Sequence, residues 1–253
     1  MDSDNYKQKK ARFDNLLTLF GRKPVLEAIR SGDITPVRLH LATSNRASPE
    51  LTEMQEIADR RHCEIVFHTR QALARISKNG RQDQGVALDV SAPRYLPLDD
   101  LPDAAARCQL IAIDAVTNPQ NLGMIVRSVA ASPIHGIILP REGCAPIDGL
   151  VIKASAGTLF KCRVYHCRQL ADGLNTARDR GYRIVGMAAE GKTSLADMPS
   201  DEAIVFVLGN ETRGLSDDVA SICSEMVSIP LANGVESLNV SVAAALVAFH
   251  ATV

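Results

Sequence analysis

The segment AIVFVLGNETRG, residues 203–214, decides the fold. Its first part is apolar on both faces, which is typical of a strand in the middle of a parallel sheet. Gly209 ends this apolar run, and a polar turn with Asn210, Glu211 and Arg213 follows. Ligands bind where the strands of a parallel sheet end, and a glycine lets a ligand approach the backbone. The segment therefore predicts an α/β fold with a binding site after this strand.

Further apolar runs of strand length surround this segment and predict the rest of the sheet. They are QLIAID (109–114), HGIILP (135–140), LFKCRVYH (159–166) and YRIVGMA (182–188). Helical stretches separate them, at 122–132, 168–181 and 239–253. The last of these is apolar nearly all round, so we expect it to be buried. Alternating strands and helices predict one parallel-sheet domain over residues 108–253.

The N-terminal part predicts a smaller α/β domain over residues 20–92. Strand-like runs at 37–42, 63–67 and 85–90 alternate with helical stretches, of which the first has Pro24 in its first turn. Charged residues 1–19 are expected to form a loose extension. Residues 93–107 are rich in proline and acidic residues, which is a linker composition.

The charge distribution and the low aromatic content bear on how the chain could bind nucleic acid. The chain has 253 residues, 46% hydrophobic residues and a net charge of -1. Residues 1–94 hold 16 Lys+Arg and 12 Asp+Glu, whereas residues 95–253 hold 12 and 17. The mildly basic first part could meet phosphates, although ordinary surface variation also explains the difference. With no tryptophan and 4% aromatic residues, an aromatic base-stacking platform is not expected.

The cysteines and apolar runs indicate a cytoplasmic protein without metal. None of the six cysteines forms a C-x-x-C pair, so they are interpreted as free thiols. The polar N-terminus does not resemble a signal peptide. The longest apolar run, Val240–Phe249, is too short to span a membrane.

The segment GMAAEGKT, residues 186–193, matches the P-loop pattern G-x-x-x-x-G-K-[ST]. A P-loop requires a helix whose N-terminus points at the phosphates. Here Pro199 would stop such a helix after about one turn. We therefore favour a solvated loop between two strands, and keep a permuted P-loop NTPase as an alternative.

Two more strand–turn–helix corners carry polar residues. In DAVTNPQNLGMIVRSVAA (114–131), Asn121 is placed to cap the helix, and Arg127 lies on an otherwise apolar helix, where it must pair, snorkel or meet an anion. In SIPLANGVESLNVSV (228–242), a strand ends at Ile229–Pro230, and Ser237 or Asn239 can cap the last helix. Each corner alone is common, and capping would explain its polar residues.

Together the three strand–turn–helix corners form a pattern that is specific to one protein family. The order N-P-x-N-x-G-x-x-x-R, G-N-E-x-R-G and I-P-x(6)-S-L-N-V-S resembles the three motifs of the SpoU/TrmH family of RNA ribose methyltransferases, over roughly residues 110–250. Residues 20–90 are similar to the small RNA-binding domain of family members that methylate a guanosine ribose in bacterial large-subunit ribosomal RNA.

The resemblance implies a trefoil knot in the C-terminal domain, S-adenosylmethionine as cofactor, and a homodimer whose partner subunit completes the site. The implied cofactor contacts are Leu208, Gly209, Asn210, Ile229, Pro230, Ser237, Leu238 and Asn239. It also implies that Arg127 lies beside the target 2′-hydroxyl with Asn121 and Glu211 as partners. Because a guanidinium stays protonated above pH 12, a phosphate clamp fits Arg127 better than a general base.

The N-terminal domain is expected to dock RNA phosphates through its basic residues Arg70, Arg75, Lys78 and Arg81. Ribosomal RNA (23S) is the first expected substrate and transfer RNA the second. A non-catalytic RNA-binding relative is the remaining alternative. It is disfavoured because Asn121, Arg127, Glu211 and Asn239 are all present.

Overall fold

The apolar runs of the second half form an eight-stranded sheet in which every neighbouring pair is parallel. This computed structural model describes residues 16–32, 34–91 and 95–250. The chain divides into two compact units at residues 93 and 94, called here the N-terminal and C-terminal units. The predicted loose residues 1–15 lie outside the described part, as do residues 92–94 of the predicted boundary.

The sheet of the C-terminal unit has the strand order β10-β12-β9-β11-β6-β7-β8-β5. Its strands are β5 (Leu96–Pro97), β6 (Gln109–Ile113), β7 (Gly136–Pro140), β8 (Val164–Cys167), β9 (Arg183–Met187), β10 (Thr193–Ser194), β11 (Ile204–Leu208) and β12 (Glu225–Ser228). The central strands β6 and β11 are buried along their whole length, as the apolar run at 203–209 predicts. Because all strands run in one direction, their carboxyl ends share one edge of the sheet.

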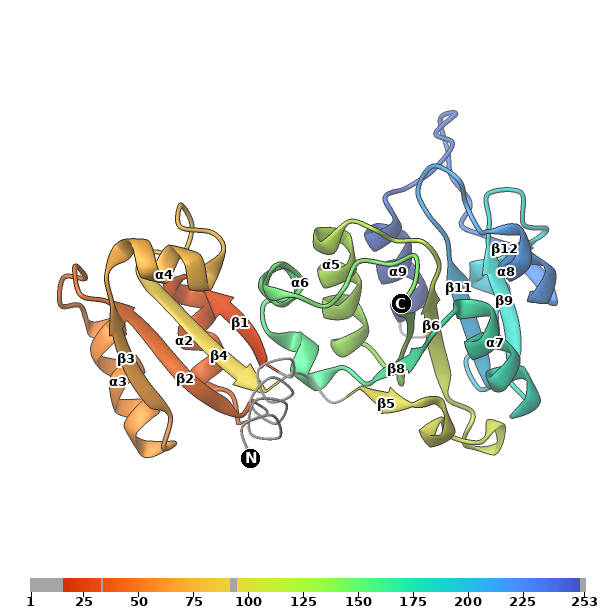
Figure 1. Ribbon diagram of the computed structural model, residues 1–253. Coiled ribbons are helices and arrows are strands. Elements are labelled where there is room, and N and C mark those ends of the chain that lie inside the picture. Colours follow the sequence, from red (N-terminus) through yellow and green to blue (C-terminus); the bar gives the residue numbers. More distant parts are fainter. Residues whose placement is uncertain (1–15, 33, 92–94, 251–253) are drawn as a thin grey trace. The chain divides into compact units, whose positions relative to one another are not determined.

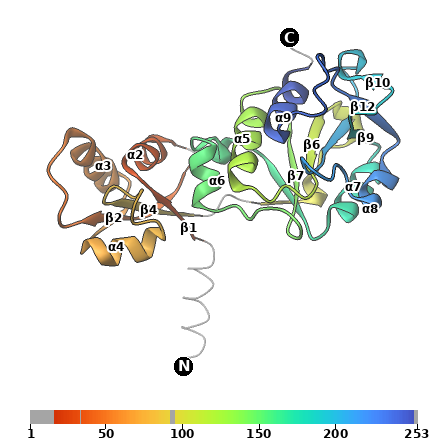
Figure 2. The same cartoon turned by 90° about the horizontal axis from the view of Figure 1, so that it is seen from above.

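Helices cover both faces of this sheet (Figures 1 and 2). The helices are α5 (Pro119–Ala130), α6 (Gly149–Ala154), α7 (Leu170–Asp179), α8 (Asp217–Ile222) and α9 (Val240–Phe249). Helix α5 packs against α6 and α9 on one face, and α7 packs against α8 on the other. No helix of the described chain is long and apolar enough to cross a membrane.

Two segments of the C-terminal unit differ from the sequence-based expectation. The strand expected from residue 159 begins only at Val164, because Thr158–Lys161 form a 3-10 turn that buries Leu159. Residues 95–107, expected within a linker, pack onto the unit instead. There β5 pairs with β8, Leu101 is buried, and the Tyr182 hydroxyl donates to the Pro102 carbonyl at 3.0 Å.

The N-terminal unit is a four-stranded mixed sheet of order β1-β4-β2-β3. Its strands are β1 (Leu16–Phe20), β2 (Pro36–Ala42), β3 (Glu64–His68) and β4 (Val86–Ser91), and its helices are α2 (Arg22–Arg30), α3 (Pro49–Arg60) and α4 (Arg70–Ser77). Helices α2 and α3 cover one face and α4 the other (Figure 2). Strand β1 was not expected, because it follows a charged segment and was counted with the loose extension. It pairs antiparallel with β4.

Candidate functional site

A cleft of about 550 Å³ opens at the carboxyl ends of β9, β11 and β12. Of the residues expected to contact a cofactor, Leu208, Gly209, Asn210, Ile229, Ser237 and Leu238 line it. Pro230 and Asn239 are not among its lining residues. Three successive segments, at 208–215, 226–231 and 236–243, therefore contribute residues to one cleft.

The loop after β11 turns back on itself at once, and this explains its glycine. Asn210 and Gly214 exchange two backbone hydrogen bonds, both 2.9 Å long. A Cβ atom on Gly209 would lie 2.4 Å from the carbonyl of Gly214, so a larger residue does not fit. The Asn210 side chain is used within the protein, since its Nδ2 donates to the Ala115 carbonyl at 3.0 Å and its Oδ1 accepts from the Thr212 N–H at 2.9 Å.

Asp114, at the end of β6, holds the far side of this loop. Its Oδ2 accepts hydrogen bonds from the backbone N–H of Ser216 at 2.7 Å and from the Ser216 hydroxyl at 2.9 Å. Asp114 is buried, whereas Ser216 precedes α8. The sequence contains a signal for this role, an acidic residue ending an apolar run, but the reasoning from motifs did not assign it one.

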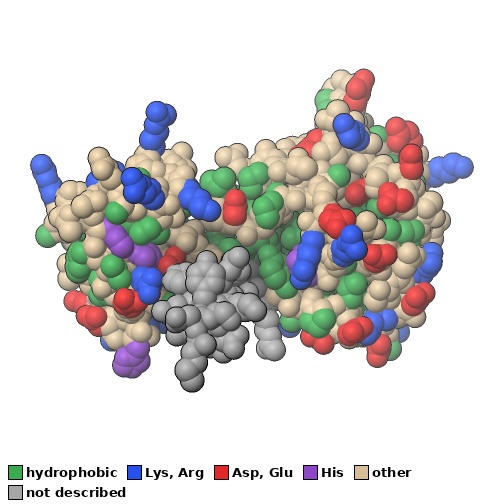
Figure 3. Space-filling view, viewed as in Figure 1, with side chains coloured by type: hydrophobic (Ala, Val, Ile, Leu, Met, Phe, Trp, Pro, Cys, Tyr) green, Lys and Arg blue, Asp and Glu red, His purple; other side chains and the backbone are tan. Residues whose placement is uncertain are grey.

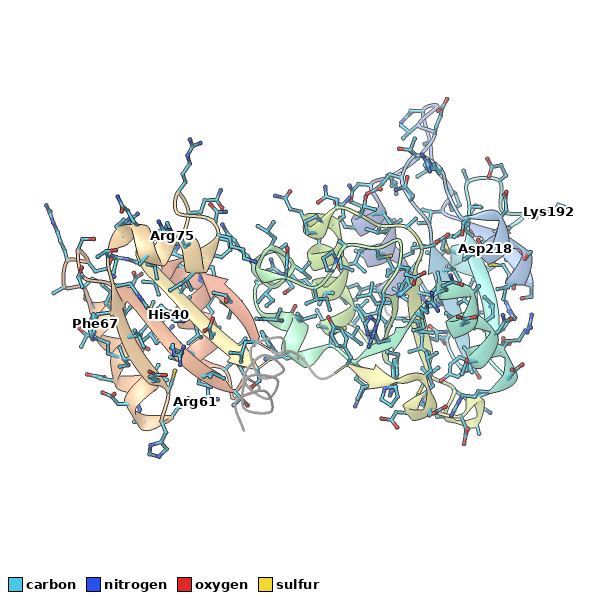
Figure 4. All side chains as sticks on the ribbon, viewed as in Figure 1. His40, Arg61, Phe67, Arg75, Lys192 and Asp218 are labelled. Carbon is cyan, nitrogen blue, oxygen red and sulfur yellow. The ribbon has the colours of Figure 1, made fainter. Side chains whose placement is uncertain are left out.

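The P-loop-like segment lines the same cleft without being a phosphate cradle. Residues 187–190 contribute to the lining, so the expectation of a merely solvated loop was incomplete. Thr193 begins strand β10 rather than a helix. A Cβ on Gly191 would lie 2.5 Å from the backbone of Val227, so this glycine lets the loop cross β12. Lys192 is not a lining residue and points outward (Figure 4).

The charges around the cleft are mainly negative. Glu190, Glu211 and Glu236 line it, and Arg213 is the one basic residue among the lining residues. Such a lining repels a nucleoside triphosphate and suits a ligand that carries positive charge.

Cys223, beside the cleft, is not activated as a nucleophile. All six cysteines are free, and burial raises the pKa of Cys223, which packs near Gly186 beside the cleft, to about 11. That thiol is therefore protonated at neutral pH. Within the described chain, no three His, Cys, Asp or Glu side chains gather as metal ligands would.

Three predicted site residues form a hydrogen-bonded chain at the start of α5. Asn121 Nδ2 donates to Oε1 of Glu211, and Asn239 Nδ2 donates to Oδ1 of Asn121 at 3.3 Å. The expectation that Asn121 caps α5 was wrong. Asn118 caps it, accepting from the Gln120 N–H at 2.8 Å, because Pro119 occupies the first helical position. Asn121 is thereby free to link α5 to the loop after β11.

Arg127 is not brought into this chain of hydrogen bonds. It lies on the exposed side of α5, where Met124 is 48% exposed. Within the described residues its guanidinium has no hydrogen bond or ion pair, and it does not line the cleft. Its five N–H donors are therefore available to a group from outside this chain.

Helix α9 is apolar on all sides but is not buried on all sides. Asn239 caps it, accepting from the Ser241 N–H at 2.9 Å. Ala244 and Val247 are fully buried, whereas Val242 and Leu246 are each 44% exposed, which corrects the expectation of complete burial. An exposed apolar stripe on a helix is typical of an interaction surface.

The predicted RNA-contacting residues of the N-terminal unit are all exposed. Arg70 and Arg75 belong to α4, Lys78 ends it with a φ of 52°, and Arg81 follows in the next loop. Arg70 lies 3.8 Å from the buried Asp83, and Figure 4 shows Arg75 on the outer side of α4.

Family comparison agrees with this geometry. Residues 109–249 match the model of the SpoU rRNA methylase family, and residues 18–96 match the model described as RNA 2′-O ribose methyltransferase substrate binding. The chain belongs to the SpoU family. It is 38% identical over 93% of its length to an uncharacterized tRNA/rRNA methyltransferase of Mycobacterium avium, covering 77% of that protein. An equivalent protein of Mycobacterium tuberculosis is 39% identical over 93% of the chain and 74% of its own length. The chain is thus an RNA methyltransferase.

Solved structures of SpoU proteins have the same fold. The methyltransferase AviRb of Streptomyces viridochromogenes, in complex with AdoMet, superposes with a TM-score of 0.79 and 24% identity over 96% of this chain and 91% of that one. An AdoMet-bound rRNA methyltransferase of Sinorhizobium meliloti gives a TM-score of 0.75 and 23% identity over 96% and 89%.

Proposed function

We propose that this protein transfers a methyl group from S-adenosylmethionine to a ribose 2′-hydroxyl of RNA, with 23S ribosomal RNA as the first candidate and transfer RNA as the second. The observation that carries the proposal is the acidic cleft at the carboxyl ends of β9, β11 and β12, which has three carboxylates and one guanidinium. S-adenosylmethionine carries a sulfonium, an ammonium and a carboxylate group, so its net charge is positive and this lining suits it better than a polyphosphate.

The residues of the cleft fit the parts of this cofactor. Ile229 and Leu238 offer apolar side chains for a flat heterocycle, and the backbone at 208–210 offers hydrogen-bonding groups. The bound cofactor would supply an electrophilic methyl group. AviRb and the Sinorhizobium enzyme, which share this fold, are described as complexes with AdoMet, and this supports the assignment. The trefoil knot is proposed from membership of the SpoU family.

The chain's own residues would then position the ribose and remove one proton. Glu211 lines the cleft and is oriented by Asn121, so it is placed to accept a proton or to orient the hydroxyl. Arg127 is unpaired within the described chain, and its guanidinium fork matches two phosphate oxygens, so it serves as a clamp for the phosphate beside the target ribose.

We further propose a homodimer built on the exposed face of α5 and α9. The Ser241 hydroxyl lies 3.8 Å from the Met124 sulfur, so the two helices share one surface. Met124, Val242 and Leu246 expose apolar area on it. Because Arg127 lies three residues after Met124 on the exposed side of α5 and does not line its own cleft, we propose that dimerisation brings it to the cleft of the partner subunit.

The choice between ribosomal and transfer RNA rests on the two-unit layout. The N-terminal unit matches a substrate-binding model. One solved structure is described as concerning the 2-OH methylation of C/U34 on tRNA. Almost all of that chain (95%) aligns with this one at a TM-score of 0.51, but the alignment covers only 57% of this chain. A separate N-terminal unit therefore favours a larger RNA. We place the reaction in the cytoplasm, where free thiols persist.

Calorimetric titration of the full chain tests the cleft assignment. S-adenosylmethionine is expected to bind with one site per chain, while magnesium-ATP gives no heat of binding. Binding of ATP that depends on Lys192, with no binding of S-adenosylmethionine, would overturn the proposal in favour of a nucleotide site at residues 186–193.

A further inference from the structure

A row of hydrogen-bonded polar side chains crosses the sheet of the N-terminal unit on the face that carries α4. The Thr18 hydroxyl donates to Oδ1 of Asp89 at 2.7 Å, and Nε2 of His40 lies 3.0 Å from Oδ2 of the same carboxylate. Nδ1 of His40 lies 2.9 Å from Nε2 of His68. The row follows the strand order β1-β4-β2-β3, so each strand contributes one residue.

The row leaves one ring nitrogen of His68 unused. An ionised carboxylate only accepts hydrogen bonds, so His40 donates to Asp89 through Nε2. Nδ1 of His40 faces Nε2 of His68, so these two nitrogens share one hydrogen bond. The outer nitrogen of His68, Nδ1, has no hydrogen-bond partner among the described residues. Burial and the nearby His40 and Arg38 lower the pKa of His68.

The row forms the polar side of an open recess of about 330 Å³, near the lower limit of typical small-ligand sites. Its apolar walls are Leu16, Val66 and Ile76, and Arg38 adds a fifth polar residue to the four of the row. Figure 4 labels His40 on this face of the sheet, and Figure 3 shows histidine rings there among hydrophobic side chains.

The carboxylates in and beside the recess disfavour a phosphate as its ligand. Asp89 is buried, and its pKa is held below the usual value: burial opposes this, but the hydrogen bonds from His40 and Thr18 outweigh it. Arg38 is paired with Glu64, whose Oε2 lies 2.7 Å from its Nε. Asp89 beside His40 and Glu64 beside Arg38 therefore offset the basic groups of the recess. The other guanidinium nitrogens of Arg38 have no hydrogen bond within the described chain, so they can still donate.

We propose that this recess holds one unpaired nucleobase of the RNA substrate, packed against the imidazole of His68 and hydrogen-bonded to His68 Nδ1 and to Arg38. Proteins recognise single-stranded RNA by stacking splayed bases on histidine or arginine planes and by bonding to their edges. Ile76 belongs to α4, the helix that carries Arg70 and Arg75, so a base in the recess and phosphates on α4 would belong to one bound strand. This inference rests on the proposed RNA methyltransferase function.

Salt-dependent RNA binding separates a base contact from a phosphate contact. The affinity of the full chain for an unmodified transcript of large-subunit ribosomal RNA is measured across a series of salt concentrations. Removing a phosphate contact, as in Lys78→Ala, is expected to reduce the slope of log affinity against log salt by roughly one. For His68→Ala, we expect at least about a fivefold loss of affinity with the slope unchanged, because stacking on a base is not electrostatic.

Two further variants control for folding and for the chemistry of the contact. Val66→Phe fills the recess and leaves both histidines in place, so it should lose affinity as His68→Ala does. His68→Phe keeps a stacking surface without the ring nitrogens, so its loss should be smaller than that of His68→Ala. Wild-type affinity in both Val66→Phe and His68→Ala, or a reduced salt slope in His68→Ala, would overturn the inference.

Failure of the methyltransferase proposal is distinguishable from failure of this one. Binding of S-adenosylmethionine to each variant is measured separately, and it should be unchanged because the recess lies in the other unit. A wild-type chain that binds no S-adenosylmethionine refutes the proposed function, whatever the result for RNA.

Discussion

Asp114 and Ser216 are 102 residues apart, yet one carboxylate oxygen of Asp114 accepts both the backbone N–H and the hydroxyl of Ser216, at 2.7 and 2.9 Å. The pair ties the end of β6 to the end of the loop that follows β11. Because that loop lines the cleft from Leu208 to Leu215, the geometry of the cleft depends on a residue that does not line it.

Asp114→Ala is therefore expected to weaken S-adenosylmethionine binding about tenfold or more. A hydrogen bond to a charged group is worth about 1.5–3 kcal/mol, and about 1.4 kcal/mol corresponds to tenfold in affinity. Titration calorimetry measures the effect. Ser216→Ala, which removes only the hydroxyl and keeps the N–H, should show a smaller loss. If both variants bind S-adenosylmethionine with wild-type affinity, the loop does not depend on the hydrogen bonds between Asp114 and Ser216.

Substitutions of Gly191 and Lys192 test whether residues 186–193 form a loop that packs across β12 or a phosphate-binding loop. Gly191→Ala places a Cβ about 2.5 Å from the Val227 backbone, and overpacking of this kind costs about 1–3 kcal/mol. The melting temperature should fall by several degrees in a thermal unfolding experiment, whereas Lys192→Ala should leave both melting and methyl transfer near wild type. Loss of activity in Lys192→Ala without loss of stability would contradict this account.

Much of the fold could be predicted from the alternation of apolar runs and helical stretches, because short apolar runs such as that at 203–209 are typical of buried central strands. The cleft could be placed for the same reason, since polar turns after parallel strands meet at one edge. Contacts between distant segments could not be predicted. Nothing in the local sequence shows that Asn121 bonds to Glu211 rather than capping its own helix, or that Gly191 is required by the backbone of Val227. The polar row of the N-terminal unit was missed because its four residues come from four strands.

Arg127 is expected to act on the substrate and not on the fold. It is exposed and unpaired within the described chain, so Arg127→Ala should leave the melting temperature unchanged. Methyl transfer should fall by about a hundredfold or more, since a bidentate phosphate clamp is lost. Arg127→Lys should recover only part of the rate, because an ammonium cannot form the same fork.

The matched control for Arg127 is Arg107→Ala. Arg107 is a largely exposed arginine of the same unit, paired with Asp201 at 3.4 Å, and it is remote from the cleft lining. Its removal should change neither rate nor stability. Wild-type turnover in Arg127→Ala would rule out both the clamp and the general-base role.

The exposed apolar stripe of α9 is expected to be a subunit interface. Leu246→Glu places a charge on a side chain that is 44% exposed in the single chain, so the monomer should still fold. Analytical ultracentrifugation should show a dimer for the wild-type chain and a monomer for the variant. Phe67→Glu, at a 58% exposed residue of the N-terminal unit, serves as the control and should remain dimeric. A monomeric wild-type chain would refute the interface directly.

The most direct test of the central claim is methyl transfer from labelled S-adenosylmethionine to unmodified large-subunit ribosomal RNA, with unmodified transfer RNA assayed in parallel. A 2′-O-methyl group blocks alkaline cleavage of the adjacent phosphodiester, so the account predicts label in an alkali-resistant dinucleotide from the ribosomal RNA. Label confined to single nucleotides after alkali would mean base methylation and would contradict the assignment of the ribose as the acceptor.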